Sequence, residues 1–348
     1  MTPPATYARH RQWSVSEYPL VDCPALQAAW TFSQTRLRAI SQALAATPLP
    51  PEIVTVGIAG SLARMEATAE SDCDLVVVLK RDVDPDSETG RRAFAAVWKG
   101  LESLRLEAPE TTGIYAGPVS LSQLLDPATI GRVSEDQRVF GSRILFLLEL
   151  QPVWGEAAFR DLGRQIVERY AECYVALDPT KQWSYLLNDL VRYFKSLCQT
   201  YMFAELADDQ RWRLRNLKAR HSRLLIYAGL LFILGESSRS TTEKQAWLAE
   251  RLTWTPLERL AACHAQYGDD QFRVLAECMN RFVSAMNTPG FQQSLAGTVD
   301  STSPLARESN PQFKELKRNG DTFLAELLRF ALARRDDWAE RFFEYWLF

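Results

Sequence analysis

The chain has 348 residues, of which 47% are hydrophobic and 24% are charged. This composition is typical of a folded protein with about two domains, and it excludes a collagen-like or wholly disordered chain. The 40 Lys and Arg residues and the 43 Asp and Glu residues leave a formal net charge of -3. Nucleic-acid binding would therefore require a local basic patch.

The cysteines and apolar runs indicate a cellular compartment. The six cysteines form no CxxC pair and there are three histidines, which argues against a zinc site of Cys and His. Residues 1–15 lack the apolar core of a signal peptide. The longest apolar runs, 144–150 and 224–234, are shorter than the ~20 residues that span a membrane. We expect a cytoplasmic protein with reduced thiols and no membrane association.

The first part of the chain shows an α/β pattern. Apolar spacing predicts a helix over 23–46, and the prolines after it end that helix. Apolar runs predict core strands at 53–58 and 75–79, joined by a short connection. A helix over 88–106 and a third strand over 111–121 follow. Strands and helices in this order indicate an α/β unit.

From residue 135 onward the pattern is helical. The ranges with helical spacing are 138–150, 157–177, 183–203, 211–234 and 243–252. We predict a core at 1–134, a helical domain at 135–286, a linker or mobile loop at 287–312 and a helical segment at 313–348. This last segment is rich in aromatic residues, so we expect it to dock on the body or to mediate self-association or binding to a partner protein.

The connection between the two core strands carries the most informative residues. It begins with Gly60-Ser61 and ends with Ser71-Asp72-Cys73-Asp74. Because side chains alternate along a strand, Asp72 and Asp74 would share one face and Cys73 the other. Neighbouring carboxylates repel unless a divalent cation lies between them, and Mg²⁺ favours carboxylate and phosphate oxygens. The alternative is a plain strand start beside a solvated turn.

The start of the connection suits a phosphate. Gly60 permits a close approach of the backbone to a ligand. The Ser61 hydroxyl and the amides of a short helix can hold phosphate oxygens. Phosphate and metal would then meet in one place.

An apolar strand, Gly-Ser, a short connection and Ser-Asp-x-Asp before another apolar strand resemble the signature of the DNA polymerase beta-like nucleotidyltransferase superfamily. The matching residues are Gly60, Ser61, Ser71, Asp72 and Asp74. The residues between them look like those of the stand-alone bacterial members. The resemblance covers about residues 25–125 and implies an α/β (α+β) nucleotidyltransferase core with a mixed sheet, followed here by an all-helical domain.

The resemblance also implies an activity. Such enzymes move a nucleoside monophosphate from a nucleoside triphosphate, such as ATP, to an acceptor hydroxyl of a small molecule, protein, RNA or nucleotide. Two Mg²⁺ ions, or Mn²⁺ in their place, would be held by Asp72 and Asp74 and would stabilise the attacking and leaving oxygens. The residues assigned to the nucleotide in this region are Gly60, Ser61, Arg64 and Ser71.

A third carboxylate usually stands on a later strand in this superfamily. The predicted strand over 111–121 contains no acid. Glu107, Glu110 and Asp189 are the candidates to replace it, and Asp189 is favoured because the polar stripe of its helix continues through Arg192. The alternative role of Asp189 is an ordinary ion pair with Arg192.

A basic segment supplies a second candidate for phosphate binding. Residues 211–223 contain six Lys and Arg residues and no acid. At helical spacing they form a polar stripe of Arg213, Asn216, Arg220, Arg223 and Tyr227. The residues assigned to a triphosphate on this helix and the preceding one are Arg192, Lys195, Arg213 and Arg220. The alternative is a solvated face, or ion pairs with Glu205, Asp208 and Asp209. His221 is predicted to be a core histidine.

Two rival functions follow from the same residues. The missing acid and the aromatic end favour a nucleotide-binding regulator or antitoxin-like partner protein that has lost catalysis. An RNA-binding module would need stacking aromatics beside the arginines, and Trp212 is the one available there. We rank this module last.

Overall fold

The structure is a computed structural model that describes residues 12–106, 112–172, 174–178, 180–206, 211–239, 243–295 and 310–347, the side chains of 201–206 excepted. The chain divides into two compact units. Unit 1 consists of Met1–Gln12, Trp30–Leu186 and Ser240–Thr255, and unit 2 consists of Trp13–Ala29, Leu187–Arg239 and Pro256–Phe348. Each unit consists of several segments that are not adjacent in sequence. The sequence analysis instead predicted consecutive parts, with a core at 1–134 followed by a helical domain at 135–286.

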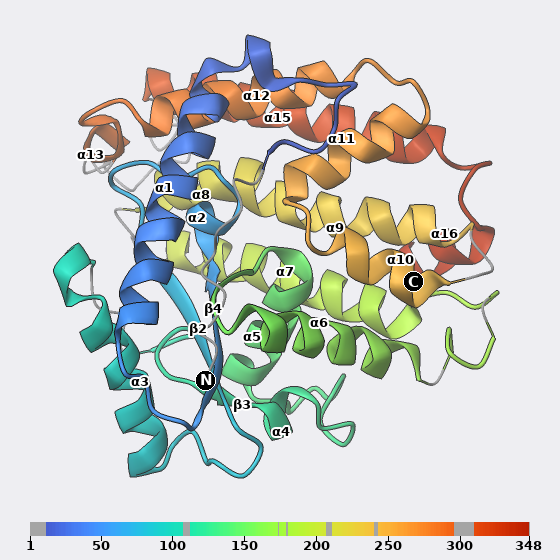
Figure 1. Cartoon of the computed structure of the whole chain (residues 1–348). Helices are drawn as coiled ribbons and strands as arrows, with labels where there is room; N and C mark the ends of the chain where they lie inside the picture. Colours follow the sequence, from blue (N-terminus) through green and yellow to red (C-terminus); the bar gives the residue numbers. More distant parts are fainter. Residues whose placement is uncertain are drawn as a thin grey trace. The chain divides into compact units, whose positions relative to one another are not determined.

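Unit 1 contains a small mixed sheet with the strand order β3-β2-β1-β4 (Figure 1). Its strands are β1 (Ile53–Ala59), β2 (Asp74–Leu79), β3 (Val119–Ser120) and β4 (Gln151–Trp154). β1 is antiparallel to β2 and β4, whereas β2 is parallel to β3. The predicted α+β class and the mixed sheet are therefore confirmed.

The predicted third strand over 111–121 is wrong in extent. Val119–Ser120 alone is extended there among the described residues, and 112–118 form turns. Gly113 has a φ of +94°, which ordinary residues avoid, and Pro118 cannot donate to a ladder. Leu121 already belongs to a helix, since Ser120 and Gln123 form a capping box at its start.

Helices surround this sheet and bury its residues. They are α1 (Pro24–Ala46, in unit 1 from Trp30), α2 (Gly60–Ala63), α3 (Glu88–Gly100), η2 (Glu102–Leu104), α4 (Leu121–Leu124), α5 (Gln137–Leu148), α6 (Glu156–Ala171) and α10 (Lys244–Arg251). One apolar cluster joins α1, β1, β2 and α3, with Leu37, Val56 and Val77 completely buried. This cluster holds the two strands that flank the Gly60 turn.

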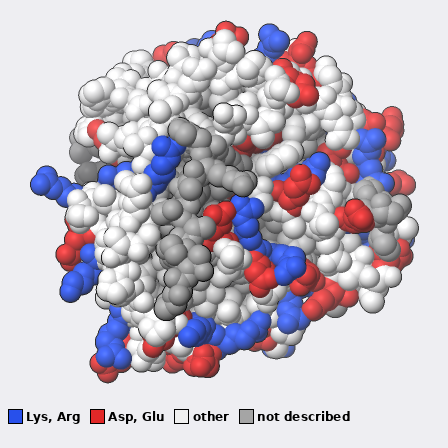
Figure 2. Space-filling view, in the orientation of Figure 1, with Lys and Arg blue, Asp and Glu red and all other residues white. Residues whose placement is uncertain are grey.

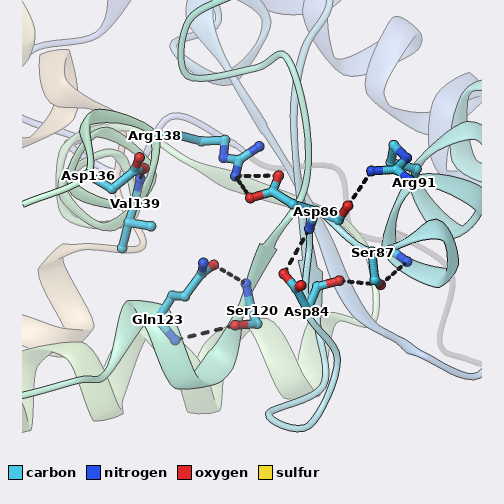
Figure 3. Close-up of polar contacts among 10 residues, drawn as sticks. Asp84, Asp86, Ser87, Arg91, Ser120, Gln123, Asp136, Arg138 and Val139 are labelled. Atoms are coloured by element: carbon cyan, nitrogen blue, oxygen red, sulfur yellow. Dashed lines mark hydrogen bonds and ion pairs between the residues drawn. The ribbon is translucent and has the colours of Figure 1, made fainter.

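Polar side chains fix the starts of several of these helices (Figure 3). The Ser87 hydroxyl accepts a hydrogen bond from the Gly90 amide at 3.1 Å, and Asp136 accepts one from the Val139 amide at 3.0 Å. Arg138 of α5 and Asp86 after β2 point toward each other and form an ion pair of 2.9 Å. These contacts tie the loop after β2 to α5.

The described residues of unit 2 form helices and their connections, with no strand among them. Its elements are the start of α1, η1 (Leu20–Asp22), α7 (Ser184–Leu206, in unit 2 from Leu187), α8 (Trp212–Lys218), the π-helical turn η3 (Ala219–Arg223), α9 (Leu224–Ser237), α11 (Pro256–Gln266), α12 (Phe272–Met286), α13 (Phe291–Leu295), α15 (Pro311–Ala333) and α16 (Glu340–Leu347). None of the helices in the described ranges is long and apolar enough to cross a membrane.

Two sequence predictions for the helical part need correction. Residues 135–286 are not entirely helical, because the strand β4 lies within them. Its four residues are too few to show strand periodicity in the sequence. Gly155, with a φ of +69°, ends the strand. The predicted linker over 287–312 contains the helix α13 and the first two residues of α15. Residues 296–309 lie outside the described residues.

The aromatic end docks on its own unit. Trp338, Phe342 and Phe343 are buried. The Trp338 indole lies against Gly235 of α9 and donates a hydrogen bond to Glu236 Oε1 at 2.7 Å. Trp346 donates to the Tyr227 hydroxyl at 3.1 Å. Docking on the body is therefore observed, and a partner for this segment stays a prediction.

Candidate functional site: the Gly60 turn and its two carboxylates

The turn between β1 and α2 depends on a glycine. Gly60 has a φ of +73°, and a Cβ atom at this position would lie 2.7 Å from Asp74 Oδ2. This proximity arises because Ala59, at the end of β1, pairs with Asp74, at the start of β2. Any other residue would be strained in this conformation and would displace the carboxylate. Gly60 thus lies directly against Asp74, and the predicted approach of its backbone to a ligand stays a prediction.

The two aspartates lie on either side of a buried thiol. Asp72 is exposed, Cys73 is buried and Asp74 is half-buried, as the period of two predicts. Burial, with a further contribution from Asp74, raises the pKa of the Cys73 thiol to about 12. Cys73 is therefore a core residue with a protonated thiol at pH 7. Within the described part of the chain, the Asp72 carboxylate forms no hydrogen bond or ion pair.

The connection is held by its own hydrogen bonds. Ser71 Oγ accepts from the Thr68 amide at 2.9 Å, and the Glu66 amide donates to Ser61 O at 2.9 Å. The Ser71 hydroxyl therefore closes a loop, whereas its predicted contact with a nucleotide stays a prediction. The Ser61 side chain is half-buried at the start of α2.

A buried charge network supports the turn from inside, and the sequence did not predict it. Glu149 Oε1 accepts a hydrogen bond from the Gly60 amide at 3.0 Å. Its other oxygen, Oε2, is 2.7 Å from Arg64 Nη1, and Arg64 Nε is 3.0 Å from Glu66 Oε2. All three side chains are at most 6% exposed. Paired charges with this burial are costly to separate.

This network changes two expectations. The sequence predicts that amides at the start of α2 donate to phosphate oxygens. The Gly60 amide instead donates its hydrogen bond to Glu149. Arg64 is enclosed between two carboxylates, which favours a positioning role over a phosphate contact. Glu149 could have been noticed in the sequence, since it is an acid inside the apolar run 144–150. A carboxylate buried in such a run needs a partner, because burying an unpaired charge is costly.

The predicted third carboxylate lies in unit 2. Asp189 on α7 is 1% exposed, and Arg192 Nη2 is 3.3 Å from its Oδ1. The ion pair proposed as the alternative role is therefore present, while Asp72 and Asp74 belong to unit 1. The catalytic role of Asp189 stays a prediction. Glu107 and Glu110 lie outside the described residues, and Lys195 is exposed on α7.

The basic segment is not one polar face. Arg213 is buried and donates from Nη1 to Leu295 O at 3.2 Å, and Tyr227 is buried as well. Arg213 precedes η3 and contacts α13, whereas the residues after η3 are rotated relative to a 3.6-residue period because η3 is a π-helical turn. Arg220 lies at this turn.

Arg220 and His221 make contacts within unit 2. Arg220 donates to Asn216 Oδ1 at 2.9 Å and forms an ion pair with Asp321. The sequence analysis gave arginine ion pairs as an alternative to phosphate binding. Such a pair is observed, but with Asp321 instead of the acids of residues 205–209. Asp208 and Asp209 are outside the described residues, as is the Glu205 side chain.

His221 is a core histidine, as predicted. It is completely buried and stacks on Phe282 with ring centroids 4.4 Å apart. The Asn319 amide donates to Nε2 at 2.9 Å, and Nδ1 lies 2.9 Å from Leu217 O. Burial lowers the pKa of His221 to about 4, so the ring is neutral at pH 7.

Charge and ligand geometry complete the description of the site. On the face drawn in Figure 2, Lys and Arg side chains lie among Asp and Glu side chains. Among the described residues, no group of three or more His, Cys, Asp or Glu side chains has the geometry of a metal site.

Comparison of the chain with models of known protein families gives no match, and comparison with curated proteins gives none either.

Proposed function

We propose that the Gly60 turn binds a nucleoside triphosphate together with Mg²⁺, and that the chain transfers the nucleoside monophosphate to an acceptor hydroxyl. The observation that carries this proposal is the approach of Gly60 to Asp74. Gly60 has a positive φ of +73°, and a Cβ atom added to it would lie 2.7 Å from Asp74 Oδ2. A glycine is therefore necessary beside this carboxylate. The nucleotidyltransferase resemblance of the Gly-Ser and Asp-x-Asp residues gives the same assignment.

The residues at the turn suit Mg²⁺. This ion is commonly bound by one or two carboxylates, with phosphate oxygens and waters as the other ligands. Asp72 and Asp74 would be those carboxylates, so a protein cluster of three acids is not required. The bound ion would supply charge neutralisation for the phosphates and for the leaving oxygen.

The chain's own residues would position the reactants. Asp74 is held against Gly60 at the start of β2, and Asp72 is open to solvent two residues earlier. The Ser61 hydroxyl can donate to a phosphate oxygen at the start of α2. Glu149 and Arg64 would keep the turn in one conformation, which preserves the spacing between the phosphates and the carboxylates.

A second function is favoured by one observation. Residues 112–118, which precede β3, contain no acid and form turns. A chain without a third carboxylate at this place would bind a nucleotide without transferring it. This is the nucleotide-binding regulator.

One experiment separates these functions. The purified chain is incubated with each nucleoside triphosphate and Mg²⁺ or Mn²⁺, and nucleotide binding is measured by calorimetry. Mass analysis of the protein, of added RNA and of small products then reports transfer and the acceptor. Asp74→Asn and Asp72→Asn should abolish metal-dependent binding or transfer, whereas Asp82→Asn, the same change at an exposed acid after β2, should leave both unchanged.

The outcomes are distinct. Binding with transfer that both variants abolish supports the nucleotidyltransferase. Binding without any product supports the regulator. If no triphosphate binds, or if Asp72→Asn and Asp74→Asn behave as Asp82→Asn does, the assignment of the Gly60 turn is wrong.

A further inference from the structure

The helix α1 carries a polar side chain on its buried face. Leu37, Ile40 and Leu44 of this helix are completely buried. Ser33 lies one helical turn before Leu37, on the same face, and is completely buried too. A buried hydroxyl is costly unless it forms a hydrogen bond, so the partner of Ser33 shows what this point of the helix holds.

The partner is a backbone amide of the connection between α2 and β2. Ser33 Oγ accepts a hydrogen bond from the Ala67 amide at 3.2 Å. Both residues belong to unit 1, and Ala67 is 1% exposed. A buried amide outside a helix or strand needs an acceptor from elsewhere in the fold. The helix α1 provides it here, from a residue that stands 34 positions earlier in the sequence.

The turn before Ala67 is fixed by the end of α2. The Glu66 amide donates to Ser61 O at 2.9 Å. The Met65 amide donates to Leu62 O at 3.3 Å. These two bonds form the Schellman pattern of a helix C-terminus, in which the residue in the left-handed conformation is usually a glycine. Met65 takes this place with a φ of +63°, and burial of its side chain in the apolar cluster of unit 1 holds it there.

The turn after Ala67 leads to the carboxylates. The Thr68 amide donates to Ser71 Oγ at 2.9 Å, and the Ser71 amide donates to Thr68 O at 3.1 Å. Asp72 follows this closed turn directly. The hydrogen bonds of Ala67 and of its neighbour Thr68 thus link α1 to the residue before Asp72.

We infer that Ser33 is a positioning residue for the metal ligand Asp72. This role rests on the proposed function, in which Asp72 and Asp74 hold Mg²⁺. Asp74 is fixed by the register of β1 and β2, whereas Asp72 precedes β2 and depends on the connection for its place. Ser33 keeps the connection against α1, so the two carboxylates keep the spacing that one ion requires.

Binding of Mn²⁺ to the full chain, measured by electron paramagnetic resonance, tests this role. Ser33→Ala removes the acceptor and should raise the dissociation constant for Mn²⁺ by about tenfold. Ser33→Cys keeps the volume of the side chain but offers a weak acceptor, so it should have the same effect. Ser41→Ala is the matched control, since Ser41 is also buried on α1 and lies about 12 Å further along the helix axis. This control should leave the affinity for Mn²⁺ unchanged.

Hydrogen exchange of the full chain without metal gives a second measurement. In Ser33→Ala the amides of residues 67–72 should exchange about tenfold faster, while those of β1 stay protected. Faster exchange with unchanged Mn²⁺ affinity would make Ser33 a structural residue only, and it overturns the inference. Weaker Mn²⁺ binding with unchanged exchange overturns it as well, as does a Ser33→Cys variant that binds Mn²⁺ like the wild type.

Asp72→Asn distinguishes this inference from the proposed function. If the wild-type chain binds no Mn²⁺, or if Asp72→Asn leaves Mn²⁺ binding unchanged, the carboxylates are not the metal site and both proposals fail. If Asp72→Asn abolishes binding and Ser33→Ala does not weaken it, the role of Ser33 alone is wrong.

Discussion

The Gly60 turn and the basic segment 211–223 have the same predicted task, phosphate binding, and the structure builds them differently. At the turn, a backbone angle and a strand register place Gly60 against Asp74, and both are properties of neighbouring strands. In the basic segment, the partners of Arg213 and Arg220 come from Leu295 and Asp321. Local backbone geometry can be predicted from a motif, whereas the exposure of a helix face depends on which distant helix covers it.

Loss of the buried acid should have the largest effect. Glu149→Ala leaves Arg64 with one of its two carboxylates and leaves the Gly60 amide without an acceptor. We expect the free energy of unfolding to fall by about 3–5 kcal/mol, measured by urea denaturation. Glu156→Ala, which breaks the partly exposed Glu156–Arg160 pair, should cost less than about 1 kcal/mol. Equal losses would show that the network does not support the turn.

Filling the glycine should have the next largest effect. Gly60→Ala combines a φ of +73° with a Cβ placed 2.7 Å from Asp74 Oδ2. The expected cost is about 2 kcal/mol, together with weaker metal-dependent nucleotide binding. Gly163→Ala is the control, because no atom lies within 4 Å of its added Cβ and alanine favours the helix α6. Nucleotide binding that survives Gly60→Ala would separate the turn from phosphate recognition.

Acid should weaken the core of unit 2 through His221. The pKa of His221 is lowered from the ordinary value of 6.5 to about 4, mainly by burial. Arg220 acts in the same direction, whereas the hydrogen bond with Leu217 O and the charge of Asp321 act against it. The unfolded chain therefore binds the proton first as the pH falls below 6.5, and stability is lost between 6.5 and 4. Between pH 7 and pH 5 this contributes about 2 kcal/mol. In the His221→Gln variant the loss measured by denaturation should be smaller by that amount.

The surface ion pair of the basic segment should have the smallest effect. A double-mutant cycle of Arg220→Ala and Asp321→Ala should give a coupling energy below about 1 kcal/mol, because both side chains are partly exposed. If Arg220 acts in this pair alone, nucleoside triphosphate binding stays unchanged in Arg220→Ala. A loss that is larger for the triphosphate than for the monophosphate would restore the phosphate-binding prediction.

The predictable part of the fold is the part with strong periodicity. Long apolar runs indicated β1 and β2, and helical spacing indicated α7 and α9. The strand β4 and the short extent of β3 were not predictable, since two to four residues carry too little pattern. The conformation of Gly155, which ends β4, is set by the surrounding structure.

The same limit applies to the site. Gly60, Asp72 and Asp74 stand out in the sequence because their spacing is local. Glu149 was missed because it contacts the Gly60 amide across a long stretch of sequence; the apolar run around it indicates that it has a partner but not which one. Arg64 was assigned to the nucleotide by the resemblance, and the sequence could not show that two carboxylates allow this charge to be buried.

The discontinuous make-up of unit 1 has a consequence for how the chain acquires its structure. The helix α10 belongs to this unit and packs on α6, and its Lys244 donates to Lys181 O at 3.0 Å. Residues 187–239, which separate these segments, belong to the other unit. During synthesis, unit 1 therefore remains incomplete until residues up to Thr255 have left the ribosome. Contacts between such distant segments slow folding, so the nascent sheet is exposed to chaperones and proteases for longer than a contiguous domain would be.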